Sequence, residues 1–284
     1  MFRRYDLSMV DESLWTPANS EAVQRCRAAL DAHDLASALL AIEDTEESLK
    51  TQVLVMLEHW AGLVRELLES STTMTETDAL RLVLVEQQEL MGDGEAFYDP
   101  RNCYLSDVLS RRSGMPILLS SIWLIVARLA GIRAEGIGMP GHFIIRIGED
   151  EDGLIDPFGG GRPLNIHRCA VIVKRLSGLE WDTDFLQPVS DEAIAARVVR
   201  NLQLCHHRNK QRVPLYRMAR FNALLLPECP AAQLLHGQVA EMIDLEPLAI
   251  PIYRSVVSRY PKSREARMAK ERIEELECEA PELH

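Results

Sequence analysis

One apolar stretch limits what this chain can fold into more than any other feature of the sequence. From Pro116 to Ala127, twelve consecutive residues carry no charge, and most of them are Ile, Leu, Trp or Val. Residues 117–130 therefore predict a helix that is apolar on almost every side, and such a helix belongs inside a domain. The stretch is too short to span a bilayer and Arg128 follows it, so we expect a buried core helix.

The region before this stretch is expected to be helical. Apolar residues recur at helical spacing in residues 35–42 and 53–68, and a third helix is expected at 76–91. Asp34 and Asp44 are expected helix starts, because a short carboxylate accepts the free N–H groups of a first turn. A short helix is expected at 103–112.

After Gly131 the hydrophobic period changes to two. Residues 134–138, 143–147 and 154–156 are predicted strands, rich in Ile, Phe and Leu. The acidic residues 149–152 and Gly153 are expected to form a solvated hairpin turn without the spacing of a calcium loop. Residues 159–161 are three glycines without a following Gly-Lys-Ser/Thr, so we expect a tight turn rather than a phosphate-binding loop.

From Ser190 onward the chain is expected to be helical again. Two segments in this part resemble each other, one around Tyr216 and one around Tyr253, and Pro227 and Pro261 stand 34 residues apart. This spacing is the tetratricopeptide period. Two such units cannot bury a solenoid core alone, so we expect them to pack on other parts of the chain.

The candidate chemistry lies between Gly114 and Arg162. A cysteine-nucleophile enzyme of the papain or transglutaminase type needs a nucleophile at the start of a buried helix, a base on a following strand and a carboxylate on the next strand. Strand periodicity places His142, Ile144 and Arg146 on one face. If the strands at 143–147 and 154–156 pair, Asp156 reaches His142.

This arrangement resembles the transglutaminase-like core of the bacterial SirB-type proteins, which have a helical N-terminal part and C-terminal tetratricopeptide repeats. The segments that carry the resemblance cover roughly 70 residues closely, a set that rarely arises by chance. They are Tyr98–Asn102, Arg111–Pro116, Arg128 with Gly131–Ile132, Pro140–Phe143 and Leu154–Phe158.

The resemblance implies an α+β, mostly helical fold. We expect residues 1–95 to form a helical N-terminal region and 96–189 a transglutaminase-like, papain-like core with a small antiparallel sheet. Residues 190–284 are expected to form a helical region similar to tetratricopeptide repeats. In the superfamily, Gly-x-Cys begins the buried helix. Here Gly114-Met115-Pro116 places Pro116 at the nucleophile position, while His142 and Asp156 match the superfamily base and its orienting carboxylate.

Several alternatives remain for these residues. The His142–Asp156 pair can be purely structural, a small binding pocket, or part of an active site that uses water or Cys103 as nucleophile. Ser120 and Ser121 are expected to bond back to main-chain carbonyls. We expect Arg101 and Asn102 to hold the turn after Pro100. Two further arginines, Arg111 and Arg112, are expected to pair with Asp99 or Asp107.

Charge is unevenly distributed along the chain. The net charge is −12, yet residues 193–227 contain seven Lys and Arg residues and no Asp or Glu. We expect protein contact rather than nucleic-acid binding there, with Arg208, Lys210 and Arg212 as candidate binding residues, because aromatic residues for base stacking are sparse. The six cysteines are scattered, as in reducing compartments. No metal is expected, because adjacent Cys205, His206 and His207 cannot close a tetrahedral site alone.

These observations lead to one functional hypothesis and one rival. The leading hypothesis is a cytoplasmic, non-catalytic interaction or regulatory protein without a cofactor, whose degenerate site keeps His142 and Asp156. The residues Met1–Trp15 lack the apolar run of a signal peptide. The rival is a hydrolase or acyltransferase that uses His142 as base and Asp156 as its orienter.

Overall fold

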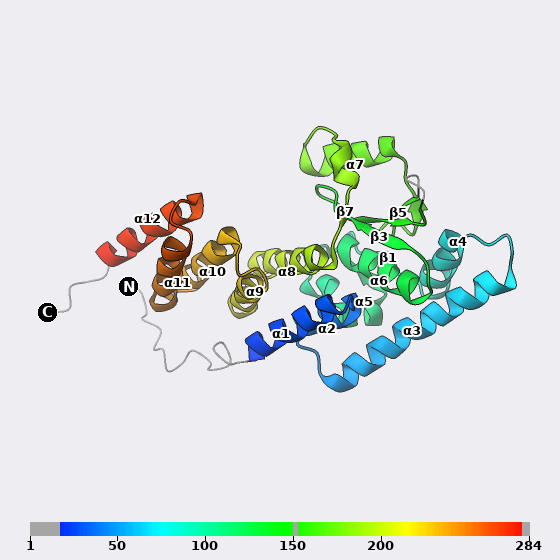
Figure 1. Cartoon of the computed structure of the whole chain (residues 1–284), viewed down its shortest axis with the longest axis horizontal. Helices are drawn as coiled ribbons and strands as arrows, with labels where there is room; N and C mark the ends of the chain where they lie inside the picture. Colours follow the sequence, from blue (N-terminus) through cyan, green and yellow to red (C-terminus); the bar gives the residue numbers. More distant parts are fainter. Residues whose placement is uncertain (1–17, 150–152, 280–284) are drawn as a thin grey trace. The chain divides into compact units, whose positions relative to one another are not determined.

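The computed structural model describes residues 18–149 and 153–279 (Figure 1). The expectations for the N-terminal 15 residues and for positions 150–152 of the acidic turn lie outside these ranges. The described α-helices are α1 (Ala18–Asp31), α2 (Leu35–Glu43), α3 (Glu47–Ser70), α4 (Glu76–Arg81), α5 (Leu105–Arg111), α6 (Pro116–Leu129), α7 (Ile166–Ser177), α8 (Asp191–Arg208), α9 (Arg212–Leu225), α10 (Pro230–Met242), α11 (Glu246–Arg259) and α12 (Arg264–Glu279).

Short elements complete the fold. They are a π-helix η3 (Leu82–Gln87), the 3-10 helices η4 (Pro100–Cys103) and η5 (Thr183–Leu186), and the strands β1 (Met91–Gly92), β2 (Ser113–Gly114), β3 (Ala134–Ile137), β4 (Ile144–Ile147), β5 (Leu154–Asp156), β6 (Arg162–Pro163) and β7 (Pro188–Val189). The predicted α+β, mostly helical class with a small antiparallel sheet is confirmed.

The chain divides into two compact units, which are described separately. Of the described residues, 25–149 and 153–198 form the core unit, and 18–24 together with 199–279 form the second unit. The boundaries fall inside α1 and α8. The core unit contains both sheets and α2 to α7, and the second unit contains α9 to α12.

The core unit is organised around α6. Its residues from Pro116 to Ala127 are all buried, which confirms the buried helix expected from the apolar stretch. The helix packs against the strands β3 and β4 and against α2, α3, α4 and α5. Because neighbours surround it on all sides, α6 needs no polar face.

The five-stranded sheet has the strand order β6-β5-β4-β3-β7, and all its neighbours are antiparallel. Alternate residues of a strand point to opposite faces. Ile137, Ile144 and Leu154 pack with Cys169 and Val173 of α7, so α7 covers the face opposite α6 (Figure 1).

Two helix boundaries differ from the sequence predictions. Asp34 is the N-cap of α2 and accepts from the Ser37 amide, as predicted. Asp44 is instead the C-cap of α2 in the left-handed conformation (φ 55°), because Asp tolerates this conformation better than most residues. The helix expected at 76–91 changes to the π-helix η3 at Leu82 and ends at Gln87.

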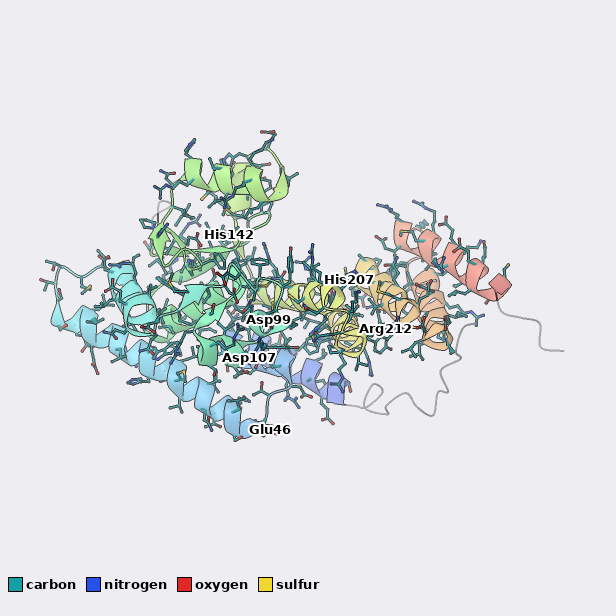
Figure 2. All side chains as sticks on the ribbon, turned by 180° about the vertical axis from the view of Figure 1, so that it is seen from behind. Glu46, Asp99, Asp107, His142, His207 and Arg212 are labelled. Carbon is teal, nitrogen blue, oxygen red and sulfur yellow. The ribbon has the colours of Figure 1, made fainter. Side chains whose placement is uncertain are left out.

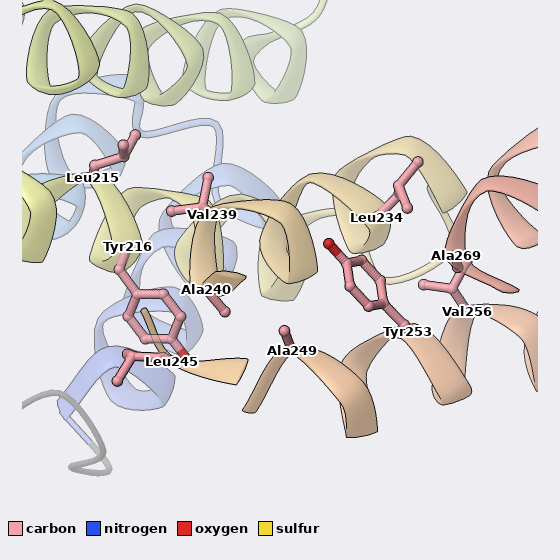
Figure 3. Close-up of a cluster of buried hydrophobic side chains, with 11 residues drawn as sticks. Leu215, Tyr216, Leu234, Val239, Ala240, Leu245, Ala249, Tyr253, Val256 and Ala269 are labelled. Carbon is pink, nitrogen blue, oxygen red and sulfur yellow. The ribbon is translucent and has the colours of Figure 1, made fainter. Parts of the chain in front are cut away.

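Besides the ends of α1 and α8, the second unit contains two helical hairpins, α9–α10 and α11–α12, in which consecutive helices pack together. Tyr253 is fully buried in its core (Figure 3) and its hydroxyl donates to Glu241 over 2.8 Å. Gly237 makes room for this ring, because a Cβ there would lie 2.5 Å from Tyr253 Cε1. In the described ranges, no helix combines the length and apolarity that crossing a bilayer requires.

Candidate functional site

The imidazole of His142 and the carboxylate of Asp156 form a hydrogen-bonded pair. Nε2 of His142 lies 3.0 Å from Oδ1 of Asp156. Both side chains are largely withdrawn from solvent, with 7% of His142 and 15% of Asp156 exposed. Figure 2 labels His142 on the core unit. A buried hydrogen bond of this kind orients the imidazole ring and selects its tautomer.

Strand pairing explains why these two residues meet. β4 and β5 are antiparallel, with Ile145 opposite Ile155. The residues just before β4 therefore lie beside the end of β5, where Asp156 stands. The predicted pairing of these strands and the predicted contact of Asp156 with His142 are confirmed by this register and this distance.

Phe158 and two glycines enclose the pair. The Phe158 ring meets the His142 ring edge to face, with centroids 6.1 Å apart. A Cβ on Gly92 would lie 2.6 Å from the Phe158 ring, and a Cβ on Gly159 would lie 2.9 Å from Asp156 Oδ2. Glycine at these two positions therefore lets β1 and the turn after β5 approach the pair closely.

Arg197 of α8 holds the turn that leads to His142. Its Nη2 donates to the carbonyl oxygens of Met139, over 3.0 Å, and of His142, over 2.9 Å. The guanidinium also lies over the Phe143 ring, 5.3 Å from its centroid. Sequence reasoning missed this role, because Arg197 is separated by 55 residues from His142 and carries no local motif.

The start of α6, where the superfamily nucleophile would stand, is occupied by Pro116 at the first helical position. The two serines inside the helix are engaged. Ser121 Oγ donates to the Ile117 carbonyl over 2.7 Å, as expected. Ser120 Oγ instead donates across to the Phe143 carbonyl of the neighbouring chain segment over 3.2 Å, because the buried helix packs directly on the sheet.

Two thiols lie near the elements that carry the pair. Cys103 is 1% exposed, and its Sγ lies 3.0 Å from Sδ of Met115, the residue before α6. Cys169 in α7 is fully buried. Burial, and then the negative charge of Asp156, raise the pKa of Cys169 to about 11, so this thiol stays protonated near neutral pH.

Asn102 organises the loop before α6. Its Nδ2 donates to Asp93 Oδ2 (3.1 Å) and to the Ala96 carbonyl (2.8 Å), and its Oδ1 accepts from Arg111 (2.9 Å). Its carbonyl accepts from the Met115 amide over 3.0 Å. Hydrogen bonds from the Ala96 amide and the Asn102 side chain hold the pKa of Asp93 below its usual value.

The arginines of this region separate into two groups. Arg101 binds the carboxylate of Asp99, as the turn interpretation predicted. The expectation that Arg111 and Arg112 pair with Asp99 or Asp107 is wrong. Arg111 pairs with Asp93 and Asn102, and the guanidinium of Arg112 lies over the Trp60 ring, 4.8 Å from its centroid.

The basic candidates Arg208, Lys210 and Arg212 are exposed and lie at the end of α8 and the start of α9. Arg212, labelled in Figure 2, pairs with Asp244 over 2.7 Å, so its charge is matched within the second unit. His206 is buried and its Nδ1 contacts Gln211. In the part of the chain that the structure describes, no three His, Cys, Asp or Glu residues gather as metal ligands.

Comparisons with known proteins identify the family of this chain. A family model described as "Transglutaminase-like superfamily" matches residues 51–200. A UPF0162 protein of Xylella fastidiosa (strain Temecula1) is 28% identical over 88% of this chain and 92% of its own length. A UPF0162 protein of Pseudomonas aeruginosa is 31% identical over 51% of this chain and 54% of its own.

A further relative comes from a mammal, and it shares only part of its length. Mouse F-box only protein 21 is 31% identical over 40% of this chain and 20% of its own length. No solved structure matches significantly. The segment matched by the superfamily model is more than half of the chain and includes α6, β4 and β5, which carry the site residues. The chain belongs to the transglutaminase-like superfamily.

Proposed function

We propose that this protein is a non-catalytic member of its superfamily that works by binding a protein partner. The observation that carries the proposal is Pro116 at the first position of α6, where the superfamily pattern Gly-x-Cys has its nucleophile. Covalent acyl transfer loses its first step without that nucleophile. The His142–Asp156 pair then holds the β4 and β5 ends together instead of activating a thiol.

Two hydroxyl groups and one thiol in the core unit support a non-catalytic site. Ser120 and Ser121 both donate to main-chain carbonyls, and Cys169 is protonated because of its raised pKa. A nucleophile has to be accessible and activated by a base within hydrogen-bond reach. None of these three groups has both properties.

The C-terminal helices are the proposed partner-binding part. Each helix of the second hairpin begins 34 residues after its counterpart, since α9 begins at Arg212 and α11 at Glu246, while α10 begins at Pro230 and α12 at Arg264. This is the tetratricopeptide period. Stacked helical hairpins of that period present extended surfaces to protein ligands, which supports a protein partner. The scattered, free cysteines of the described residues support the proposed cytoplasmic location.

Thiol labelling tests the catalytic part of the proposal. Native wild-type protein and the His142→Ala variant are treated with a thiol-reactive electrophile, and the labelled cysteines are identified by peptide mass mapping. We expect the exposed Cys278 to react first, with equal rates in both proteins. Labelling of one cysteine that depends on His142 would contradict the proposal. The Cys278→Ser variant removes the background reaction.

One observation favours the alternative, a hydrolase or acyltransferase. The contact between Cys103 Sγ and Met115 Sδ places this thiol at the start of α6, close to the position of the missing nucleophile. In that case Cys103 is the labelled residue, and both Cys103→Ser and His142→Ala abolish its labelling. If water is the nucleophile, His142→Ala abolishes ester or amide hydrolysis while Cys103→Ser retains it.

Affinity capture tests the partner. The intact protein and a version without residues 190–284 are used as baits in extracts of the source cells. We expect specific proteins with the intact bait alone, and equal recovery by both baits would place the binding surface elsewhere. Retention on a polyanion at low salt that is lost when Arg208, Lys210 and Arg212 become Ser would instead support nucleic-acid binding.

A further inference from the structure

A cavity in the core unit, separate from the His142–Asp156 pair, has walls suited to an anion. Its volume is about 600 Å³, within the range of small-molecule pockets. The walls come from the start of α4, from β5 and β6, and from the three-glycine turn that joins these strands. Its polar and apolar lining includes Thr75, Thr77, Arg81, Ile155, Arg162 and Pro163.

Two guanidinium groups face this cavity from different elements. Arg81, in α4, pairs with Glu86 over 2.5 Å. Because both side chains are largely exposed, this ion pair is weak and Arg81 can bind a second anion. Arg162, in β6, forms no side-chain hydrogen bond or ion pair within residues 18–149 and 153–279. Its strand partner Asp156 bonds with His142 instead. With respect to the described residues, the charge of Arg162 is therefore available to a ligand.

Two described carboxylates on the elements around the cavity have partners of their own, and one of them, Asp78, is part of the wall. Asp78 accepts from the Thr75 hydroxyl over 2.7 Å, and its own amide donates back to that oxygen over 3.1 Å. Glu149, in the hairpin before Gly153, pairs with Arg133 over 3.2 Å. The hydroxyl of Thr77 adds a neutral donor to the wall.

The glycine turn shapes the cavity but does not bind the anion through its amides. The amides of Gly159, Gly160 and Gly161 all donate to carbonyls of the same turn, those of Asp156 and Pro157. This agrees with the tight turn expected from the sequence. Gly161 has a positive φ of 71°, and a Cβ there would lie 2.6 Å from the Trp123 ring and 3.3 Å from Arg81 Cγ. The glycine thus lets the stem of Arg81 lie against the turn.

We propose that this cavity binds a phosphomonoester. A phosphate dianion matches two guanidinium groups that approach from different walls, because arginine forms paired hydrogen bonds with phosphate oxygens. The hydroxyl of Thr77 donates to a remaining oxygen. The organic part of the ligand lies along the apolar side chains of Ile155 and Pro163. The site is independent of the proposed partner-binding function, since its residues take no part in either the His142–Asp156 pair or the C-terminal helices.

Isothermal titration calorimetry on the full chain tests the proposal. The probes are adenosine 5′-monophosphate, inorganic phosphate, adenosine and succinate, each in the same low-salt buffer. We expect saturable binding of the two phosphate compounds, tighter for the nucleotide, and none of adenosine or succinate. Succinate binding as tight as that of phosphate would overturn the choice of phosphate over carboxylate.

Three variants locate the binding. Arg162→Gln removes the exposed guanidinium of the edge strand β6 and is expected to weaken phosphate binding by at least about tenfold. Arg81→Gln is expected to weaken it similarly. Arg168→Gln, at an exposed position in α7 outside the cavity, is the matched control and leaves binding unchanged. Absence of wild-type binding, or equal binding by Arg162→Gln and wild type with unchanged circular dichroism, would overturn the site.

Discussion

The guanidinium of Arg197 donates to the carbonyl oxygen of His142 over 2.9 Å. The same nitrogen reaches the carbonyl of Met139, so one side chain closes the turn from which the imidazole projects. The side chain of His142 is oriented by Asp156 and its main chain by Arg197. The position of the ring therefore depends on α8 as much as on the sheet.

Loss of Arg197 is expected to destabilise the core unit. Arg197→Gln breaks two hydrogen bonds from a charged donor and is expected to lower the free energy of unfolding by about 2–4 kcal/mol. Urea unfolding followed by tryptophan fluorescence measures this, because Trp60, Trp123 and Trp181 all lie in the core unit. Arg200→Gln, on the exposed side of the same helix, is the control. Equal stability of both variants would contradict the role given to Arg197.

Asn102 is expected to be more important for stability than its size suggests. Asn102→Ala removes the buried amide that bonds to both Asp93 and Arg111. This loss is expected to lower the free energy of unfolding by about 2–4 kcal/mol. Asn165→Ala, which removes the exposed N-cap of α7, is expected to cost about 1 kcal/mol. Urea unfolding of the two variants compares them, and a larger loss for Asn165→Ala would refute the ranking.

Glu43 is expected to give stability a specific pH dependence. Its carboxylate accepts from the amide and hydroxyl of Ser106 at the start of α5, yet burial raises its pKa above the ordinary 4.5. The folded state thus binds the proton more tightly than the unfolded state. The contribution of Glu43 is fully present below pH 4.5 and declines as pH rises through the raised pKa.

The Glu43→Gln variant isolates this effect. The stability of wild type relative to Glu43→Gln is expected to be greatest at low pH and to decline as pH rises through the raised pKa, because the variant does not titrate there. Urea unfolding of both proteins at several pH values measures the difference. A difference that grows with pH would show that the pKa is lowered instead.

Gly237 is expected to be essential for the packing of α10 against α11. Gly237→Ala puts a methyl group against the Tyr253 ring, 2.5 Å from Cε1, and such overpacking costs about 1–3 kcal/mol. Hydrogen exchange followed by mass spectrometry should show faster exchange in residues 230–259 and no change in 134–156. Gly94→Ala is the control, since no atom lies within 4 Å of a Cβ there. Unchanged exchange in 230–259 would contradict the packing argument.

Local sequence patterns were sufficient for much of the core. The apolar run predicted α6 because burial on all sides leaves an unmistakable composition, and strand alternation predicted the pairing that joins His142 and Asp156. The sequence reasoning did not predict α7. In this helix only Cys169 and Val173 are buried, and the β-branched run Val171–Val173 favours a strand over a helix in its local preference.

Other features depend on residues that are distant in the chain. The partners of Arg111 and Arg112 depend on which elements pack around α5. The residues next to Asp93 and Trp60 in the sequence do not indicate these contacts. The π-helix at Leu82–Gln87 replaced an expected α-helix, because hydrophobic periodicity does not separate the two kinds of turn over a few residues. The sequence also does not show that Asp156 bonds with His142 rather than with its strand neighbour Arg162.

α8 also determines the smallest piece of this chain that should fold by itself. Its first half contributes Asp191, whose carboxylate binds Arg128 over 2.9 Å, and Arg197, which binds the two carbonyls before β4. A fragment that ended at β7 would leave Arg128, at the end of α6, without its partner Asp191. It would also lack the hydrogen bonds from Arg197 to the turn before β4. We therefore expect a fragment that folds by itself to extend at least to Val198, where the core unit ends, because the first two turns of this helix stabilise the superfamily domain.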